Sequence, residues 1–417
     1  MLLLQKNTLL KKGFLFSFFS FLNSGINFFL ILILARYFST EEYGSLNLFN
    51  TCMTLITPII SLSTMGYLGV VYYQKSKLYF KNVVRVVVLT SLIVLLFLCL
   101  FIVSGGGWLE EQVGIEKKYL LLVVVICFLQ VFTLINLELW RLEENPLQYG
   151  IYTLGITICN FVITLLLVTV NNEGWESRIY TLFGVTLFFS LLSISFIIKR
   201  GYLSFEFPRK VIFYQTLLFG LPLIPHQLSF WMRQGLDRFI INYSFSQSSV
   251  GIFSFASNFA NIILILGTAF NATNSVYIYK TIAENSDLAG QGLLKQTRMM
   301  FILFAVATIV VVSGAYWLSP IIFPLYTDSL VYVFPLCLSA FVHCVYLLFV
   351  NYIFYLKKTR QLMSITITFS ILHVCLSLLF TQYDMLITAY IGLFCNILIC
   401  LSVIYYSNKL YPIFIKK

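Results

Sequence analysis

Charged side chains are scarce in this chain of 417 residues, of which only 10% are Asp, Glu, Lys or Arg. A soluble domain carries about 25% charged residues, because its surface must be hydrated. Apolar residues make up 59% of the chain, which leaves room for about twelve bilayer-spanning helices of roughly 20 residues each. The composition therefore excludes one compact water-soluble core and predicts an all-α polytopic membrane protein.

The sequence also lacks the motifs of common enzyme chemistry. It contains no Walker motif, no HExxH and no GxSxG, so ATP hydrolysis, zinc proteolysis and acyl transfer lack their required groups. The nine cysteines fall in or beside apolar runs without a CxxC pair, and we interpret them as packing residues. We therefore expect a protein that is not an enzyme and holds no resident cofactor or metal.

Apolar runs separated by polar breaks predict twelve spans. They cover residues 14–35, 46–71, 83–104, 119–140, 148–170, 178–198, 212–233, 250–272, 298–318, 330–353, 362–380 and 385–406. Most of the 27 Lys and Arg residues share the side of the N-terminus, whereas most acidic residues lie on the other side. The positive-inside rule then places both termini in the cytoplasm. Because the Lys and Arg residues behind the net charge of +11 follow this membrane pattern, we expect no nucleic-acid partner.

The two halves of the chain resemble each other at an offset of 207 residues. Phe38–Gly44 aligns with Phe245–Gly251, and the span after each segment has polar residues on one helical face. These residues are Asn47, Asn50, Thr54, Thr57, Ser61 and Thr64 in the first half and Ser254, Ser257, Asn261, Thr268 and Asn271 in the second. We predict two six-helix bundles, 1–207 and 208–417, related by a pseudo-two-fold axis along the membrane normal. The polar faces are interpreted as the lining of a substrate cavity; in the alternative they hold helices together.

The seventh span carries the most informative residues. Pro222 and Pro225 predict a bent or broken helix, which is tolerated at membrane depth where it lines a cavity. His226, Arg233 and Asp237 follow at spacings of seven and four, roughly on one helical face. Arg233 is the main candidate for binding an anionic substrate, since a cation inside a span usually marks an ion or substrate path. In the alternative interpretation, Arg233 pairs with Asp237. The other candidate binding residues are Gln227 and Arg238, and in the first span Asn27 and Arg36.

Several short segments resemble a known family. They are Ala35–Ser39, Glu41–Gly44, Phe219–Pro225, Asp237–Ile241 and Val250–Phe253. They are similar to the polysaccharide transporter branch of the multidrug/oligosaccharidyl-lipid/polysaccharide exporter superfamily, which includes the Wzx-type O-antigen flippases. The resemblance extends over the whole chain in span number and repeat layout, although these segments cover only 25 residues.

This resemblance implies a flippase that moves undecaprenyl-diphosphate-linked oligosaccharide, an O-antigen or capsule repeat unit, across the bacterial inner membrane by alternating access. A polysaccharide polymerase and a chain-length regulator are the protein partners that such a role implies. Coupling to H⁺ or Na⁺ stays open, with Asp237, Glu138 and His226 as weak candidates. Two other functions also stay open: a cation-coupled drug exporter of the same fold, and a membrane glycan polymerase or ligase, for which the connections between spans are short.

Overall fold

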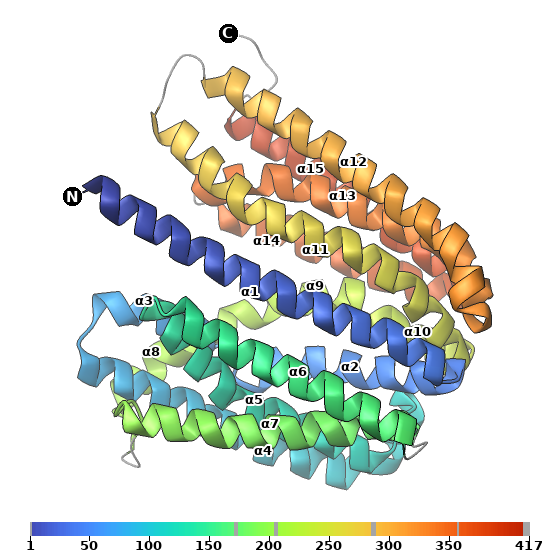
Figure 1. Cartoon of the computed structure of the whole chain (residues 1–417), viewed down its shortest axis with the longest axis horizontal. Coiled ribbons are helices and arrows are strands. Elements are labelled where there is room, and N and C mark those ends of the chain that lie inside the picture. Colours follow the sequence, from blue (N-terminus) through green and yellow to red (C-terminus); the bar gives the residue numbers. More distant parts are fainter. Residues whose placement is uncertain (1, 171–173, 204–206, 285–288, 357, 412–417) are drawn as a thin grey trace. The chain divides into compact units, whose positions relative to one another are not determined.

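The computed structural model describes residues 2–170, 174–203, 207–284, 289–356 and 358–411. Every regular element in these ranges is a helix (Figure 1). Eleven helical segments of this part are long and apolar enough to cross a membrane, and a bent pair of helices raises the number to twelve. The predicted all-α polytopic fold with about twelve spans is therefore confirmed.

The described helices divide between two compact units. The first unit comprises residues 1–38 and 45–228, and the second comprises residues 39–44 and 229–417. The second unit thus takes a short segment from the first half of the chain. The bundles 1–207 and 208–417 stay a prediction about the sequence repeat.

The first unit is built mainly from long helices, with a few short ones. Within it, α5 packs against α4 and α7, and α6 packs against α1 and α7. Between α5, α6 and α7, the rings of Trp140, Tyr152 and Phe189 meet edge to face. The elements that lie wholly or partly in this unit are α1 (Leu2–Tyr37), α2 (Thr40–Ile60), α3 (Met65–Gln74), α4 (Lys77–Val113), α5 (Lys117–Leu142), α6 (Pro146–Val170), α7 (Glu176–Lys199), α8 (Lys210–Gly220), η1 (Leu221–Leu223) and α9 (Ile224–Gln234). The first turn of α2, up to Gly44, and the second half of α9, from Ser229, belong to the second unit.

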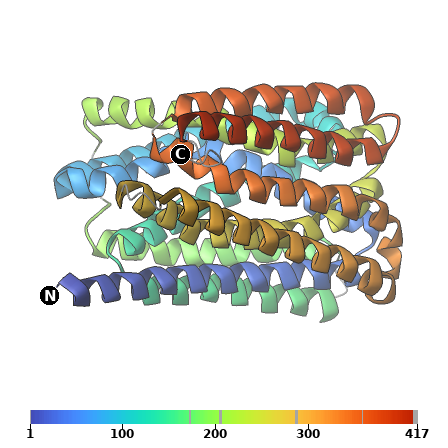
Figure 2. The same ribbon diagram turned by 90° about the horizontal axis from the view of Figure 1, so that it is seen from above.

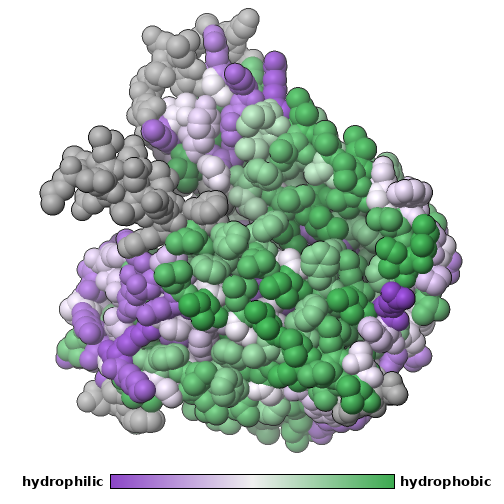
Figure 3. Space-filling model, in the orientation of Figure 1, coloured by the Kyte–Doolittle hydropathy of each residue, from purple (hydrophilic) through white to green (hydrophobic). Residues whose placement is uncertain are grey.

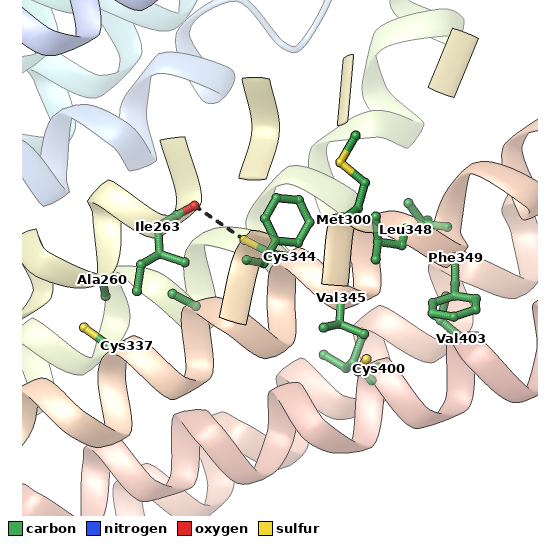
Figure 4. Packing of buried hydrophobic residues seen from close by; sticks show 14 of the residues in the cluster. Ala260, Ile263, Met300, Cys337, Cys344, Val345, Leu348, Phe349, Cys400 and Val403 are labelled. Atoms are coloured by element: carbon green, nitrogen blue, oxygen red, sulfur yellow. Dashed lines mark hydrogen bonds between the residues drawn. The ribbon is translucent and has the colours of Figure 1, made fainter. Parts of the chain in front are cut away.

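The second unit is centred on one helix, α13, which packs against α11, α12 and α15 (Figures 1 and 2). Small and medium apolar side chains, including Ala260, Cys337 and Cys400, fill the space between these helices (Figure 4). The Cys344 thiol donates to the Ile263 carbonyl at 3.5 Å, so this cysteine packs as the sequence predicted. The elements are α10 (Leu236–Ser244), α11 (Gln247–Glu284), α12 (Ala289–Ile322), η2 (Pro324–Ser329), α13 (Leu330–Tyr355), α14 (Thr359–Phe380) and α15 (Met385–Leu410).

Large apolar side chains are exposed on the outer faces of the helices, and Figure 3 shows hydrophobic residues over most of the visible face. Examples are Phe97 and Leu100 on α4 and Ile309 and Val310 on α12, each more than 60% exposed. Water would hydrate such faces poorly, whereas the hydrocarbon of a bilayer matches them. The chain is therefore a multi-pass membrane protein.

Two spans are broken in the middle, and one of these breaks was predicted. Pro222 lies in η1, the single 3₁₀ turn that separates α8 from α9. The second break bends α2 against α3 by 41° at residues 61–64, where Leu62 and Ser63 adopt positive φ angles. The two breaks pack together, because a side chain on Gly220 would meet the Leu62 carbonyl. Close backbone contact thus explains a glycine at this position.

The aligned segments of the two halves contact each other within the second unit. Ser39 caps α2 through the backbone N–H of Glu42, and Ser246 caps α11 through that of Ser249 in the same way. A Cβ on Gly44 would meet the Gln247 carbonyl, and one on Gly251 would meet the Thr40 carbonyl. Since these contacts are reciprocal at the offset of the repeat, they support the predicted pseudo-two-fold relationship.

Candidate functional site

Arg233 lies near the end of α9, and its hydrogen-bonding partners are neutral. Its Nη1 donates to the Asn396 Oδ1 at 3.0 Å, and the Asn396 amide in turn donates to the Ser339 Oγ at 2.7 Å. Its Nε is buried without a hydrogen-bond partner among the described residues. A buried guanidinium in this situation retains both its positive charge and a free donor for an anion.

Aromatic and imidazole rings surround the same guanidinium. The Phe230 ring centroid lies 6.0 Å from the Arg233 Cζ. His343 lies 6.3 Å from Phe230 and 5.2 Å from Tyr346, measured between ring centroids. The site therefore combines a cation with flat rings, a setting in which a cation–π contact can stabilise Arg233.

Asp237 does not pair with Arg233, so the alternative interpretation of the sequence is wrong. Its Oδ1 accepts a hydrogen bond from the His373 Nε2 at 2.9 Å and another from the Ser377 Oγ at 3.2 Å. Both partners belong to α14. The reason is that the helix does not continue through this region: α9 ends at Gln234, and α10 begins at Leu236 after a turn at Gly235. The single helical face expected for His226, Arg233 and Asp237 is consequently interrupted.

The neighbouring candidates take separate places. Arg238 donates to the Ser254 Oγ of α11 at 3.0 Å and to the Gln234 carbonyl at 2.6 Å. His226 and Gln227 are exposed on α9 and belong to the first unit. Arg233, Asp237 and Arg238 therefore all belong to the second unit, each with partners of its own, whereas the role of His226 and Gln227 stays a prediction.

The candidates of the first unit are only partly enclosed. Arg36 is exposed in the last turn of α1, and Asn27 donates its amide to the Asn23 carbonyl at 3.1 Å. On α2, Asn47 and Asn50 are half-buried and Thr54 is exposed, with its hydroxyl bonded to its own helix. Substrate binding by these five residues stays a prediction.

The polar face of α11 is used partly for contacts between helices. Ser254 accepts from Arg238, and Asn271 accepts from the Asn351 amide of α13 at 2.7 Å. These contacts are of the kind that joins helices in membranes. Asn261 and Ser257 are half-buried on the same helix, and substrate binding by Asn261 and Asn271 stays a prediction.

Four residues of this site were not among the sequence candidates: Ser339, His373, Ser377 and Asn396. A signal for two of them was present, because Thr366, Ser370, His373 and Ser377 recur at helical spacing along α14, and all four are buried. A buried polar stripe of this kind marks a face turned toward protein. For Asn396 and Ser339 the sequence offers only isolated polar residues in apolar runs.

The first unit holds one span arginine in a comparable way. Arg178 of α7 donates through its Nη1 to the Asn160 Oδ1 and the Thr164 Oγ1 of α6, both at 3.0 Å. Both partners are buried and neutral. Arg178 therefore joins two helices, and it serves below as a matched comparison for Arg233.

Solved structures with a similar fold are transporters and a flippase. An inward-facing multidrug resistance MATE family transporter of the MOP superfamily superposes with a TM-score of 0.76 at 14% identity, covering 94% of this chain and 95% of that chain. The lipid II flippase MurJ in an inward closed conformation gives 0.74 at 14% identity, covering 94% and 87%. The chain therefore shares the fold of these proteins.

Sequence relatives give the family. A family model described as polysaccharide biosynthesis protein matches residues 9–277, and the chain belongs to this family. A Haemophilus influenzae protein named Lsg locus putative protein 1 is 24% identical over 369 residues, which is 86% of this chain and 88% of the relative. A second Haemophilus influenzae protein, an uncharacterized membrane protein, is 25% identical and covers 81% of each chain.

Proposed function

We propose that the protein is a flippase that moves undecaprenyl-diphosphate-linked oligosaccharide from the cytoplasmic to the periplasmic leaflet of the bacterial inner membrane by alternating access. The family and the fold support a transporter or flippase used in polysaccharide synthesis. A polysaccharide polymerase and a chain-length regulator would act on the delivered repeat units.

A buried cation inside the spans suits the transport of a lipid-linked sugar. A lipid-linked sugar has an apolar tail that can stay in the bilayer, and an anionic, polar head that cannot cross hydrocarbon without polar partners. The observation that carries the proposal is Arg233, whose partner Asn396 is neutral and whose Nε is buried and unpartnered among the described residues. A diphosphate would satisfy this donor with a charge-assisted hydrogen bond.

The expected effect of removing this contact is large. A hydrogen bond to a charged group contributes roughly 1.5–3 kcal/mol, so Arg233→Ala should weaken binding by about 10- to 150-fold. Arg233→Lys keeps the charge but loses the fork-shaped donor set, and it should retain part of the activity.

The test is export of surface polysaccharide by a flippase-deficient strain that carries each variant at equal membrane level. Arg233→Ala should abolish export and Arg233→Lys should keep part of it. At Asn396 the neighbour can be changed instead: Asn396→Asp gives Arg233 a carboxylate that competes with the substrate, whereas Asn396→Ala leaves its charge free. Export should be lost with Asp and largely kept with Ala.

Full export by Arg233→Ala would contradict the role of Arg233. Loss of drug efflux with unchanged polysaccharide export would instead favour the drug exporter of the same fold.

A further inference from the structure

An aromatic ring beside the Arg233 guanidinium is left half-exposed. Phe230 lies three positions before Arg233 on α9, and its ring centroid is 6.0 Å from the Arg233 Cζ. The Phe230 side chain is 48% exposed, whereas its neighbour Ser229 is buried. Close packing in the core of the second unit therefore does not account for this ring, because a core side chain is enclosed on all sides.

The neighbours of Phe230 on α9 indicate that its exposed face meets a polar environment and not lipid. Gln227 lies one turn earlier and is exposed, and Gln234 lies one turn later and is half-buried. These three positions share one helical face, since they are three and four residues apart. Exposing an amide side chain to hydrocarbon is costly in free energy, so a face with two of them is turned toward water or a polar ligand.

Two more rings, both from α13, continue the aromatic surface. The ring centroid of His343 is 6.3 Å from that of Phe230 and 5.2 Å from that of Tyr346. Both side chains are half-buried, and both interact electrostatically with Arg233. Among the described residues, neither the His343 imidazole nor the Tyr346 hydroxyl forms a hydrogen bond. Flat apolar surface and unused polar atoms therefore lie together near the guanidinium.

A pyranose ring matches this combination of groups. It has a face of C–H groups that can pack against an aromatic ring, and a rim of hydroxyls that need hydrogen-bond partners. An acyl chain has no such rim, and a bare phosphate has no apolar face. A diphosphate is joined to its sugar through a single oxygen, so the 6.0 Å between the Arg233 Cζ and the Phe230 ring allows the phosphate and the sugar to meet one group each.

We infer that Phe230 stacks against the apolar face of the sugar that is linked to the diphosphate, and that the Tyr346 hydroxyl forms a hydrogen bond with the same sugar. This sugar subsite rests on the proposed function, because the diphosphate on Arg233 places the sugar over the ring. The subsite gives the protein a means to distinguish the glycosylated lipid from the same lipid diphosphate without a sugar.

The contribution of the sugar can be measured separately from that of the diphosphate. The purified full-length protein in lipid nanodiscs is titrated with farnesyl diphosphate and with glucosyl farnesyl diphosphate, which differ only by one pyranose. Glucose is chosen because its equatorial hydroxyls leave C–H groups on both faces of the ring. The ratio of the two dissociation constants is the sugar increment. We expect the glucosylated ligand to bind about 2- to 12-fold more tightly, the contribution of a good aromatic contact.

Variants then assign the increment to residues. Phe230→Leu should reduce it to nearly one, since leucine is apolar but not flat, and Phe230→Trp should keep it. Phe334→Leu on α13 is the matched control, because this side chain is 50% exposed in the same unit, and it should keep the increment. Tyr346→Phe should lower the increment and leave the affinity for farnesyl diphosphate unchanged. Arg233→Ala should weaken both ligands by the same factor.

The outcomes separate the subsite from the proposed function. Equal affinity of the unmodified protein for the two ligands, or an increment that survives in Phe230→Leu, would overturn the sugar subsite and leave the diphosphate contact in place. An increment that is lost equally in Phe334→Leu would also overturn it. Binding of neither ligand would contradict the proposed function and the subsite together.

Discussion

The two units bury their polar groups in different ways. The first unit holds Arg178 between two neutral side chains of α6. The second unit holds Arg233 by a single amide and adds the acid–base pair of Asp237 and His373. Asp237 is the one buried carboxylate among the described residues. An arginine whose donors meet several neutral oxygens is part of the scaffold, whereas an under-bonded arginine and a titratable pair leave room for ligands.

Both units also contain one place where helix backbones approach closely. In the first unit it is Gly220 against Leu62, at the two helix breaks, and in the second it is Gly251 against Thr40. A methyl group at either glycine would collide with a carbonyl oxygen, and backbone cannot move aside as a flexible side chain can. Each unit therefore has its own close backbone contact at a glycine, although the ionisable groups of the two units differ.

The largest effect on stability is expected at these glycines. Gly220→Ala and Gly251→Ala should each lower the free energy of unfolding by about 3 kcal/mol, the upper range for overpacking. Gly314→Ala on α12 is the matched control, because its Cβ would meet nothing within 4 Å, and it should be neutral or slightly stabilising. Thermal unfolding of the purified variants in detergent measures this. A Gly251→Ala protein as stable as Gly314→Ala would show that the α2–α11 contact is loose.

The next largest effects are expected at the two arginines, Arg178 and Arg233. Arg178→Gln should cost about 1 kcal/mol, since side-chain hydrogen bonds between helices inside membranes contribute modestly, and it should keep polysaccharide export. Arg233→Gln should cost a similar amount of stability and yet lose export. Export assays at matched protein levels compare the two. Equal loss of export in both variants would remove the distinction between a scaffold arginine and a binding arginine.

The smallest effect is expected for the amide pair of α11 and α13. A double-mutant cycle of Asn271→Ala and Asn351→Ala should give a coupling of about 0.6 kcal/mol, the mean for side-chain hydrogen bonds in a membrane protein. If the coupling is absent while Asn271→Ala loses export, Asn271 belongs to substrate binding, as the polar stripe of the sequence suggested.

Much of the fold follows from local sequence signals. Span number follows from apolar runs, and the break in the seventh span follows from Pro222 and Pro225, because proline acts on its own backbone. The second break, at residues 61–64, was not predicted. Pro58 precedes it within α2, but Leu62 and Ser63 are not residue types that announce a left-handed conformation.

Only some residues of the candidate site could be predicted from the sequence. Arg233 stood out as a cation in an apolar run, and the structure places it beside Asn396, which is 163 positions away. The alternative that pairs Asp237 with Arg233 came from helical spacing, whereas a turn at Gly235 and the approach of α14 give Asp237 the partner His373. Contacts between distant helices depend on tertiary packing, which residue spacing does not encode.

The internal repeat shows both what the sequence predicts and what it does not. The alignment of Phe38–Gly44 with Phe245–Gly251 was visible in the sequence, and both segments begin a helix with a serine cap. Their direct contact through Gly44 and Gly251 was not visible, because an internal repeat predicts similar structure and does not predict that the copies touch.

The central claim is that this protein moves a lipid-linked oligosaccharide and holds its diphosphate through Arg233. The most direct test reconstitutes the purified protein in liposomes with a fluorescent undecaprenyl-diphosphate oligosaccharide and follows its transfer between leaflets with a membrane-impermeant quencher. The account predicts transfer by the unmodified protein and, at limiting lipid, a rate about 10- to 150-fold lower in Arg233→Ala. Transfer at the same rate by Arg233→Ala, or no transfer by the unmodified protein, would contradict it.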